Sequence, residues 1–454
     1  MKVVIDIFKN RNEVENYIYK SYMRAVKNID KNLPDKDTRN PQLTKKILNL
    51  LGDPDLNQKN IMVTGSKGKG SVSRIIAKLL EAHGYKIGLF TSPHLIKFNE
   101  RIRINGIAIS DDDLIKYADE IKSTVDSIES KLPNNIYIGP LGITVVIAML
   151  YFKDNKTDFN IIECGKGARY DDVAFIESDI SVINNIFLEH VPQLGNTISE
   201  VAYNKSGVIK RNHKAVFTSN QHLETIKIIE ENARELSVPL KKYGDDFVCK
   251  NISISTKGTK FDVKTKKNLY PNLELKLLGS HQAYNATLSL GVCEELVENI
   301  DLNKVKKCFS NLTWPGRLEI VNYKPLTIID GCINRESTKY VKEIIDNIKK
   351  SNIILIVGIP DDKDYYGVVD EFKNISYKII ATRTKNQYMK FTNNQNEVIY
   401  KLVEDKFIFI ENLKDSIDYA YKSIKEDELL LVLGTQSLIR ETKEYFKQAT
   451  TDLD

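Results

Sequence analysis

The chain has 454 residues, of which 42% are hydrophobic and 28% charged, a composition typical of a globular protein long enough for two or three domains. Its 66 basic and 61 acidic residues lie in short mixed runs and give a net charge of only +5, which argues against nucleic-acid binding. Five separated cysteines form no CxxC pair, and no apolar run approaches the roughly 20 residues of a membrane span, so we expect a soluble cytoplasmic protein without a disulfide framework or zinc site.

Helices are predicted for the first 50 residues, and alternating strands and helices follow. Residues 12–50 have a helical pattern that is broken at the sequence NLPDKDTRNP. From residue 61 the apolar runs IMVT, KIGLFT, DFNIIEC and DISVINN alternate with helical stretches, among them a charged helix at about 111–131 and a buried one at LGITVVIAMLYF. This alternation is typical of a parallel sheet covered by helices on both faces.

A glycine-rich loop separates the run IMVT from a helix predicted over residues 71–83. The loop reads GSKGKGS, a shortened relative of the pattern that binds phosphates in nucleotide-binding proteins. Glycines let backbone N–H groups turn towards a polyphosphate, Lys69 supplies a charge, and the helix adds its positive end. A glycine-rich turn with incidental lysines is the alternative, but strand, loop and helix agree. We therefore predict nucleotide binding by this phosphate loop, whose residues are Gly65, Ser66, Lys67, Gly68, Lys69, Gly70 and Ser71.

Three polar residues follow three of the predicted strands and are candidates for a metal site. Ser92 follows IGLFT, Glu163 ends FNIIE, and His190 comes after DISVINN. Each alone has a simpler interpretation, as a turn serine, a solvent-facing acid or a surface imidazole. Side chains at strand ends, however, emerge at the ligand edge of a parallel sheet, and a bound triphosphate needs Mg²⁺. The three together favour a magnesium site.

Lys205 lies on a helix predicted near residues 197–206, which opens with the capping box TISE. Because Val201 is one helical turn away, Lys205 lies beside an apolar position. From the residues alone, a lysine whose stem lies along the helix edge is the simpler interpretation.

The second half of the chain changes character. Residues 245–280 alternate in the strand period and predict a small antiparallel appendage, followed by a helix at about 283–298. The segment NLTWPGRLEIVNYKP predicts a domain crossover, and the strand-like runs LTIID, NIILIVG, YKIIATR, KFIFIE and LLLVLGT follow it. We predict an α/β fold with two domains: a P-loop ATPase-like domain over residues 1–310, with a mostly parallel sheet and the appendage, and a Rossmann-like domain over residues 311–454.

Several longer motifs carry a resemblance to a known family. The phosphate loop lies within TGSKGKGSV, residues 88–110 read GLFTSPHLIKFNERIRINGIAIS, and GSHQAYNA, WPGRLE, DDKD and VLGTQSLI follow. Together these motifs resemble the Mur ligase superfamily, and specifically its folylpolyglutamate synthase/dihydrofolate synthase branch. The resemblance extends from about residue 37 to the end of the sequence and is most specific between residues 64 and 110.

The resemblance implies an ADP-forming amide ligase, in which ATP phosphorylates a carboxylate and the amine of an amino acid attacks the acyl phosphate. It implies that Lys69, Lys205 and His190 are catalytic, with Lys69 at the terminal phosphates and Lys205 carbamoylated as a metal-bridging anion. Bringing Lys69 and Asp330 into one site requires the two domains to close, which excludes water from the acyl phosphate. The other implied contacts are those of Ser92, Glu163 and His190 with magnesium, His281, Gln282 and Asn285 with adenine, Arg317 with the phosphates, and Asp330 with the ribose.

Four segments depart from the family pattern. ECGKGARYDDVA keeps Glu163 but loses the family's ending, the family's Asp–His pair is Glu189–His190, and YIGPLG stands where the family usually has TYFE. In DGCIN, Ile333 replaces a histidine and removes a hydrogen-bonding group. Because most ATP and metal positions survive, we expect the ligase chemistry to persist on an acid other than folate.

Three functions stay open. The leading hypothesis is a ligase that joins an amino acid to a carboxylate on a non-folate acceptor, such as a murein- or pseudomurein-type cell-wall peptide precursor. The first alternative is a folylpolyglutamate synthase that adds glutamate to folates, and the second is a nucleotide-binding regulator that has lost catalysis. The expected partners are a small-molecule acid, an amino acid, ATP and Mg²⁺, with no nucleic acid or membrane, and the protein is expected to be a monomer, as is usual in this branch.

Overall fold

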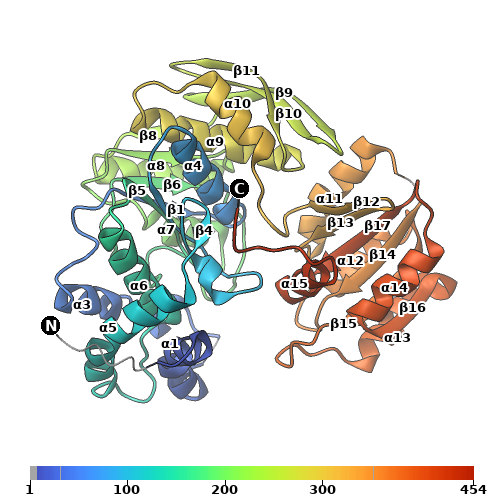
Figure 1. Cartoon of the computed structure of the whole chain (residues 1–454), viewed down its shortest axis with the longest axis horizontal. Coiled ribbons are helices and arrows are strands. Elements are labelled where there is room, and N and C mark those ends of the chain that lie inside the picture. Colours follow the sequence, from blue (N-terminus) through green and yellow to red (C-terminus); the bar gives the residue numbers. More distant parts are fainter. Residues whose placement is uncertain (1–7, 31, 351, 454) are drawn as a thin grey trace.

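The computed structural model describes residues 8–30, 32–350 and 352–453, which form two lobes, each built on its own sheet (Figure 1). Within these residues the larger sheet has eight strands in the order β4-β3-β2-β5-β1-β6-β7-β8, parallel from β2 to β8 and antiparallel at β3 and β4. Its central strands are buried along their whole length, so they are mostly apolar, although Asn160 of β5 and Ser181 of β6 are buried polar exceptions. The strands are β1 (Asn60–Thr64), β2 (Ile87–Phe90), β3 (Ile102–Ile104), β4 (Ile107–Ala108), β5 (Phe159–Glu163), β6 (Ile180–Ile183), β7 (Ala215–Thr218) and β8 (Leu240–Lys242).

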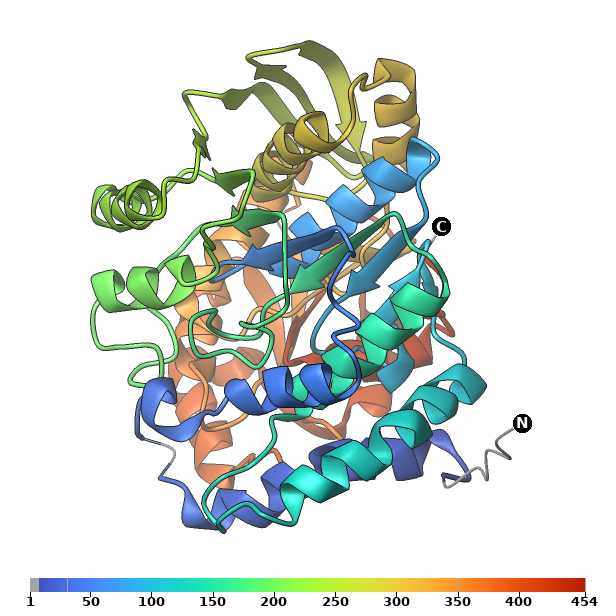
Figure 2. The ribbon, with the colours of Figure 1, turned by 90° about the vertical axis from the view of Figure 1, so that its left-hand side faces the viewer.

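Helices cover both faces of this sheet (Figure 2). Met62 of β1 packs into one core with α1, α3, α5 and α6, whereas its neighbours Ile61 and Val63 pack into a second core with α4, α9 and α10. Successive strand side chains point to opposite faces, so one strand supplies both cores. The helices of this lobe are α1 (Arg11–Ala25), η1 (Val26–Asn28), α2 (Asp35–Thr38), α3 (Gln42–Leu50), α4 (Lys69–Ala82), η2 (Phe98–Arg101), α5 (Asp111–Glu129), α6 (Pro140–Asp154), α7 (Ile198–Ser206), α8 (Leu223–Glu235), α9 (Ser280–Leu296) and α10 (Leu302–Asn311).

The helices predicted from the sequence are confirmed, with small shifts of their ends. The apolar helix α6 is buried on almost every side, as expected for LGITVVIAMLYF. The helix after the phosphate loop begins at Lys69 rather than at residue 71, because Gly68 takes a left-handed conformation and serves as its N-cap. Among the described residues, no helix combines the length and apolar character needed to cross a membrane.

An antiparallel sheet of three strands, in the order β11-β10-β9, lies at one edge of the first lobe and confirms the predicted appendage. Its apolar side chains pack with α9 and α10, so the appendage shares the core on that face of the main sheet. Its strands are β9 (Phe247–Ser255), β10 (Gly258–Thr265) and β11 (Leu269–Leu275).

The second lobe holds a six-stranded sheet in the order β12-β13-β17-β14-β15-β16, parallel except at β12. The chain enters it from α10 through residues 312–318, which we call the crossover. All five strands predicted here are confirmed, whereas β12, within the segment expected to be crossover, was not predicted as a strand. The elements are β12 (Glu319–Tyr323), β13 (Leu326–Asp330), α11 (Arg335–Ile348), β14 (Ile353–Gly358), α12 (Tyr365–Phe372), β15 (Ser376–Arg383), α13 (Asn393–Val403), η3 (Glu404–Lys406), β16 (Phe407–Asn412), α14 (Leu413–Ser423), β17 (Leu429–Gly434) and α15 (Gln436–Tyr445).

The capping box predicted for α7 is confirmed. The hydroxyl of Thr197 accepts a hydrogen bond from the backbone N–H of Glu200, and the Glu200 carboxylate accepts from the backbone N–H of Thr197, both at 3.2 Å. These bonds satisfy two N–H groups that the helix itself leaves unpaired. The cap matters for the site because α7 carries Lys205.

Replacing Thr197 with alanine tests how much this cap contributes. Thr197 is exposed, so the change removes the cap and little packing. We expect Thr197→Ala to lower the free energy of unfolding by about 1 kcal/mol, measured from the urea midpoint of the helical signal. Thr197→Ser keeps the hydroxyl and is the matched control. Equal midpoints for the alanine and serine variants would contradict the expectation.

Candidate functional site

The phosphate loop, residues 65–71, joins β1 to α4 along a path that needs glycine at two positions. Gly65 has φ of +143° and Gly68 has φ of +75°. A Cβ atom on Gly65 would lie 2.9 Å from Cβ of Asn184, and one on Gly68 would lie 2.5 Å from its Nδ2. The loop can therefore lie this close to the end of β6 only because both side chains are absent.

Asn184 holds the loop against α9. Its Nδ2 donates to the carbonyl oxygen of Lys67 at 2.9 Å and to Oδ1 of Asn285 at 2.8 Å. The Nδ2 of Asn285 in turn donates to Oε1 of Gln282 at 3.0 Å. Asn285 and Gln282, predicted to approach adenine, are both buried, and their amides take part in holding the loop.

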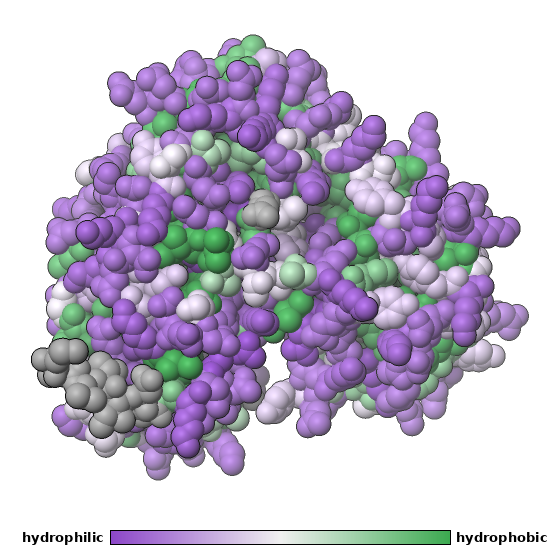
Figure 3. Space-filling model, viewed as in Figure 1, coloured by the Kyte–Doolittle hydropathy of each residue, from purple (hydrophilic) through white to green (hydrophobic). Residues whose placement is uncertain are grey.

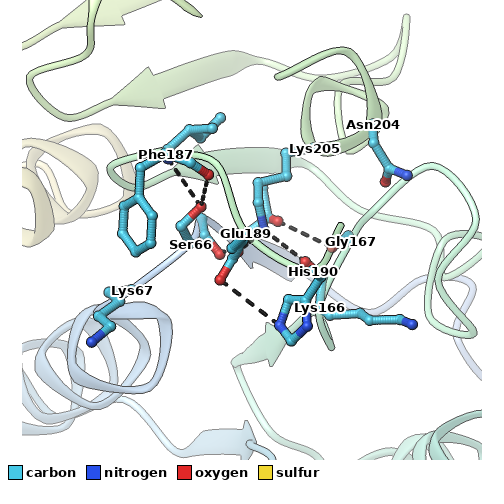
Figure 4. A network of polar contacts seen from close by, with 12 residues as sticks. Ser66, Lys67, Lys166, Gly167, Phe187, Glu189, His190, Asn204 and Lys205 are labelled. Atoms are coloured by element: carbon cyan, nitrogen blue, oxygen red, sulfur yellow. Dashed lines mark hydrogen bonds and ion pairs between the residues drawn. The ribbon is translucent and has the colours of Figure 1, made fainter. Parts of the chain in front are cut away.

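Ser66 and Trp314 close the loop on two further sides. The hydroxyl of Ser66 donates to the carbonyl of Phe187 and accepts from its N–H, both at 3.1 Å (Figure 4). The indole of Trp314, in the crossover, lies 3.1 Å from where a Cβ atom on Gly70 would be. The crossover between the two lobes thus packs directly on the first turn of α4.

Lys69, Glu163 and Ser92 meet beside the loop. The Nζ of Lys69 donates to the carbonyl of Gly65 at 3.0 Å. Glu163, at the end of β5, accepts a bond from the backbone N–H of Ser92 at 2.9 Å. Burial raises the pKa of Glu163, and the charge of Lys69 opposes that rise. Ser92 and Glu163, two of the three residues predicted from strand ends, are therefore close together beside Lys69 of the phosphate loop.

Lys67 faces the second lobe. Burial lowers its pKa, and the carboxylate of Asp330, at the end of β13, is the largest influence that opposes the shift. Arg317, in the crossover, acts on both groups, and Asp330 accepts a bond from the N–H of Leu318 at 2.9 Å. Residues of both lobes and of the crossover therefore share one charged site.

Lys205 is fully buried beneath the loop (Figure 4). Its Nζ donates to the carbonyls of Gly65 at 2.9 Å and Lys166 at 2.6 Å, and it lies 2.9 Å from Oε1 of Glu189. Burial and the charge of Lys69 lower its pKa to about 8. Two backbone carbonyls and one carboxylate therefore surround the ammonium group of the unmodified lysine. The simpler interpretation, a lysine lying along the helix edge, is wrong because this side chain points inward.

His190 is less enclosed than the other predicted metal ligands. Half of its side chain is exposed, its φ is +49°, and its Nε2 lies 3.8 Å from Oε2 of Glu189. In the part of the chain that the structure describes, no three His, Cys, Asp or Glu side chains gather as a metal cage. Mg²⁺ needs no such cage, since it retains waters and binds through one or two carboxylates and substrate phosphates. The buried carboxylate of Glu163 beside Lys69 fits that requirement.

His281 lies where α9 of the first lobe meets α11 of the second. Its ring is 4.6 Å from the ring of Tyr340, measured between centroids. Burial, with Lys67 and Arg317 nearby, lowers its pKa to about 3, so the imidazole is neutral. Its position near Lys67 connects the predicted adenine side of the site to the phosphate loop.

Two of the departures from the family pattern touch each other. The carboxylate of Asp172 lies 2.0 Å from where a Cβ atom on Gly139 would be, so the YIGPLG segment needs glycine there. Arg39 lies 3.5 Å from Asp172 and 4.0 Å from Asp171. Burial raises the pKa of Asp172 to about 6, against the opposing charge of Arg39. A third departure, Ile333, packs against the apolar core of the second lobe instead of offering a polar group.

Several residues of this site were not predicted as site residues. Asn184 stands at a strand end in DISVINN, so its position offered the same signal that identified Glu163. Glu189 was noted only as a departure from the family pattern, although it pairs with Lys205. Tyr340 and Lys166 carry no local signal, because the fold alone brings them to the site.

Comparisons with known proteins identify the family and the fold of the chain. Residues 63–293 match the Mur ligase middle domain, and residues 316–436 match the Mur ligase glutamate ligase domain. The dihydrofolate synthase/folylpolyglutamate synthase of Bacillus subtilis is 30% identical over 419 residues, which cover 89% of this chain and 94% of that protein. The folylpolyglutamate synthase structure from Thermotoga maritima has a TM-score of 0.83 at 25% identity and covers 96% of both chains. That from Mycobacterium tuberculosis, complexed with ADP and AMPPCP, has a TM-score of 0.84 at 23% identity over 91% of this chain and 97% of its own.

The pairing of Lys205 can be tested by removing its charge. Lys205→Met leaves the buried carboxylate of Glu189 without its cation, and we expect the free energy of unfolding to fall by about 3 kcal/mol. The measurement is urea unfolding followed by circular dichroism.

A second variant separates lost pairing from lost packing. Adding Glu189→Leu to Lys205→Met removes the unpaired carboxylate, so the double variant should regain part of the loss. If the losses of unfolding free energy in the two single variants simply add in the double variant, direct pairing of the two side chains is contradicted.

Proposed function

Because the chain belongs to the Mur ligase superfamily, in its folylpolyglutamate synthase branch, and is therefore an ATP-dependent ligase, we propose that it joins an amino acid to the carboxylate of a folate-type acid. The observation that carries the proposal is the meeting of both lobes at the phosphate loop. Lys69 lies at the start of α4, and Lys67 faces Asp330 and Arg317 across the domain boundary. This arrangement suits a polyphosphate held between two domains.

In this proposal the phosphate loop binds the polyphosphate of ATP. Backbone N–H groups at the start of α4 face the phosphates, and Lys69 and Arg317 neutralise charge from the two sides. Magnesium, held by Glu163 with Ser92 and His190 nearby, supplies further charge neutralisation when it is bound. Asp330 lies beside Lys67 and is assigned to the ribose, and His281 to the adenine. Carbamoylation of Lys205 remains a prediction; here its ammonium group contacts two carbonyls and the Glu189 carboxylate.

The reaction needs positioning more than a side-chain nucleophile. A carboxylate oxygen of the acid attacks the terminal phosphorus of ATP, and ADP leaves. The amine nitrogen of the amino acid then attacks the carbonyl carbon of the acyl phosphate, and phosphate leaves. Fixed positive groups stabilise the charge that develops on the transferred phosphoryl group. Contact between the two lobes over the loop limits the access of water to the acyl phosphate.

The relatives favour a folate acceptor over a cell-wall peptide. The Bacillus subtilis protein is a dihydrofolate synthase/folylpolyglutamate synthase by name, and the second domain matches a glutamate ligase domain. We therefore prefer the first alternative, glutamate addition to folates, to the murein- or pseudomurein-type peptide that led the sequence-based hypotheses. The second alternative, a nucleotide-binding regulator that has lost catalysis, is not supported, because the chain belongs to a family of ATP-dependent ligases. A monomeric state and a cytoplasmic location remain predictions.

Amino-acid-dependent release of ADP tests this function. We expect ADP release that requires both glutamate and a reduced folate or dihydropteroate. Lys69→Ala should lower kcat by about 100-fold or more, because it removes a charge at the transferred phosphate. Lys257→Ala, in the exposed turn between β9 and β10, is the control and should leave kcat unchanged.

The choice of acceptor separates the remaining interpretations. Turnover with nucleotide-linked peptides but not with folates would favour the cell-wall alternative. No ADP release with either class of acid, from protein that binds ATP, would contradict the proposal.

A further inference from the structure

The end of the described chain forms a second connection between the two lobes (Figure 1). We call residues 449–453 the tail. Just before it, Gln448 belongs to the second lobe, where its Oε1 accepts a bond from Nζ of Lys443 on α15 at 2.9 Å. Thr450 already belongs to the first lobe, where it donates to Glu100. Only Ala449 lies between these two anchors, so the connection can span about 7 Å at most.

The tail docks on β4, the edge strand of the eight-stranded sheet. The N–H of Ala108 donates to the carbonyl of Thr451 at 3.0 Å, and the N–H of Leu453 donates to the carbonyl of Gly106 at 3.3 Å. Gly106 has φ of +81°, and a Cβ atom there would lie 2.6 Å from the carbonyl oxygen of Leu453. The tail thus covers backbone groups that an edge strand otherwise exposes.

Two buried arginines bind the backbone of the tail. Arg103 donates to the carbonyls of Thr451 at 2.5 Å and Thr450 at 2.6 Å, and Arg74 donates to that of Leu453 at 2.5 Å. Both guanidinium groups are almost fully buried. Because a buried charge without hydrogen-bond acceptors is costly, the docked tail is strongly favoured.

The tail also reaches the loop that carries Ser92. The hydroxyl of Thr450 donates to Oε1 of Glu100 at 2.6 Å. The same carboxylate accepts the backbone N–H groups of residues 95–97 at 3.0, 3.0 and 2.8 Å. Ser92 begins this loop and donates to Glu163. One carboxylate therefore joins the tail to the segment that positions the proposed metal site.

The crossover and the tail leave the second lobe from one joint. The Nζ of Lys443 contacts Oε1 of Glu319 at 2.5 Å, and Oε2 of Glu319 accepts the N–H of Gly316 in the crossover at 2.7 Å. Next to Gly316 lie Ile439 of α15 and Leu95 of the Ser92 loop. Because Lys443 also holds Gln448, the two connections share one network.

We infer that the tail is a structural tether that fixes the pivot of domain closure, and that Thr450 and Glu100 are positioning residues for the site. Two connections that leave one joint prevent the lobes from separating there, so closure is a rotation about the joint. The lobes also meet at the top of the molecule, above a notch between them (Figure 3). Any rotation that moves the tail is transmitted through Glu100 to residues 95–97, in the loop that begins at Ser92. The effect on catalysis rests on the proposed function, whereas the tether itself does not.

Hydrogen exchange of the ligand-free protein tests the tether. Thr450→Val removes the bond to Glu100 while keeping the side-chain shape. We expect the amides of residues 95–97 to exchange about tenfold faster, while those of β14 stay unchanged. Thr451→Val is the matched control, because only the backbone of Thr451 makes the contacts described above. Unchanged exchange at residues 95–97, or an equal rise throughout the chain, would overturn the inference.

A chain that ends at Gln448 tests the pivot. We expect small-angle scattering to show a wider range of lobe separations than in the intact chain, and nucleotide to restore compactness only in part. Equal scattering curves for the truncated and the intact chain would overturn the inference.

For catalysis, Thr450→Val should raise KM for ATP while Thr451→Val leaves it unchanged. Faster exchange in a protein without ligase activity would contradict the proposed function and leave the tether supported.

Discussion

The carbonyl oxygen of Gly65 accepts hydrogen bonds from both Lys69 and Lys205, and the rest of the site depends on this shared acceptor. It requires the phosphate loop to turn its first carbonyl towards the interior, which the positive φ of Gly65 permits. Two ammonium groups near one oxygen repel each other, and the carboxylates of Glu163 and Glu189 offset that repulsion. The loop, β5 and α7 thus share one electrostatic arrangement even without a ligand.

Much of the fold could be predicted from the sequence because its strands are buried on both faces. β14 and β17 read as uninterrupted apolar runs, β1 and β5 as mostly apolar ones, and α6 as a helix without a polar face. Most of the strands that were missed lie where that signal fails. β3, β4 and β8 have two or three residues each, and β12 is only partly buried and lies in a segment that contains tryptophan and prolines. β7 is as long and as buried as β6, and it was missed although it carries the same signal.

The site was predictable only where a local pattern carried it. The glycine-lysine loop and the polar residues at strand ends are patterns of a few residues. The structure brings Lys69, Glu163 and Ser92 together, whereas His190 lies half exposed beside Glu189. The pairing of Asn184 with Asn285 joins positions 101 residues apart, and the contact of His281 with Tyr340 depends on how the lobes are docked. Lys205 points inward because of how α7 is rotated about its own axis, and the position of Val201 alone does not determine that rotation. These features arise from tertiary packing, which short sequence patterns do not encode.

The packing of Trp314 against Gly70 has a practical consequence. It is the only tryptophan in the chain, so the intrinsic emission of the protein at long wavelength comes from one place, the contact between the crossover and the first turn of α4. A change in the polarity or mobility around that indole reports on the loop and on the joint between the lobes together. Trp314 is thus an intrinsic fluorophore at the contact between the crossover and the phosphate loop, so changes there can be followed by stopped-flow fluorescence without a label.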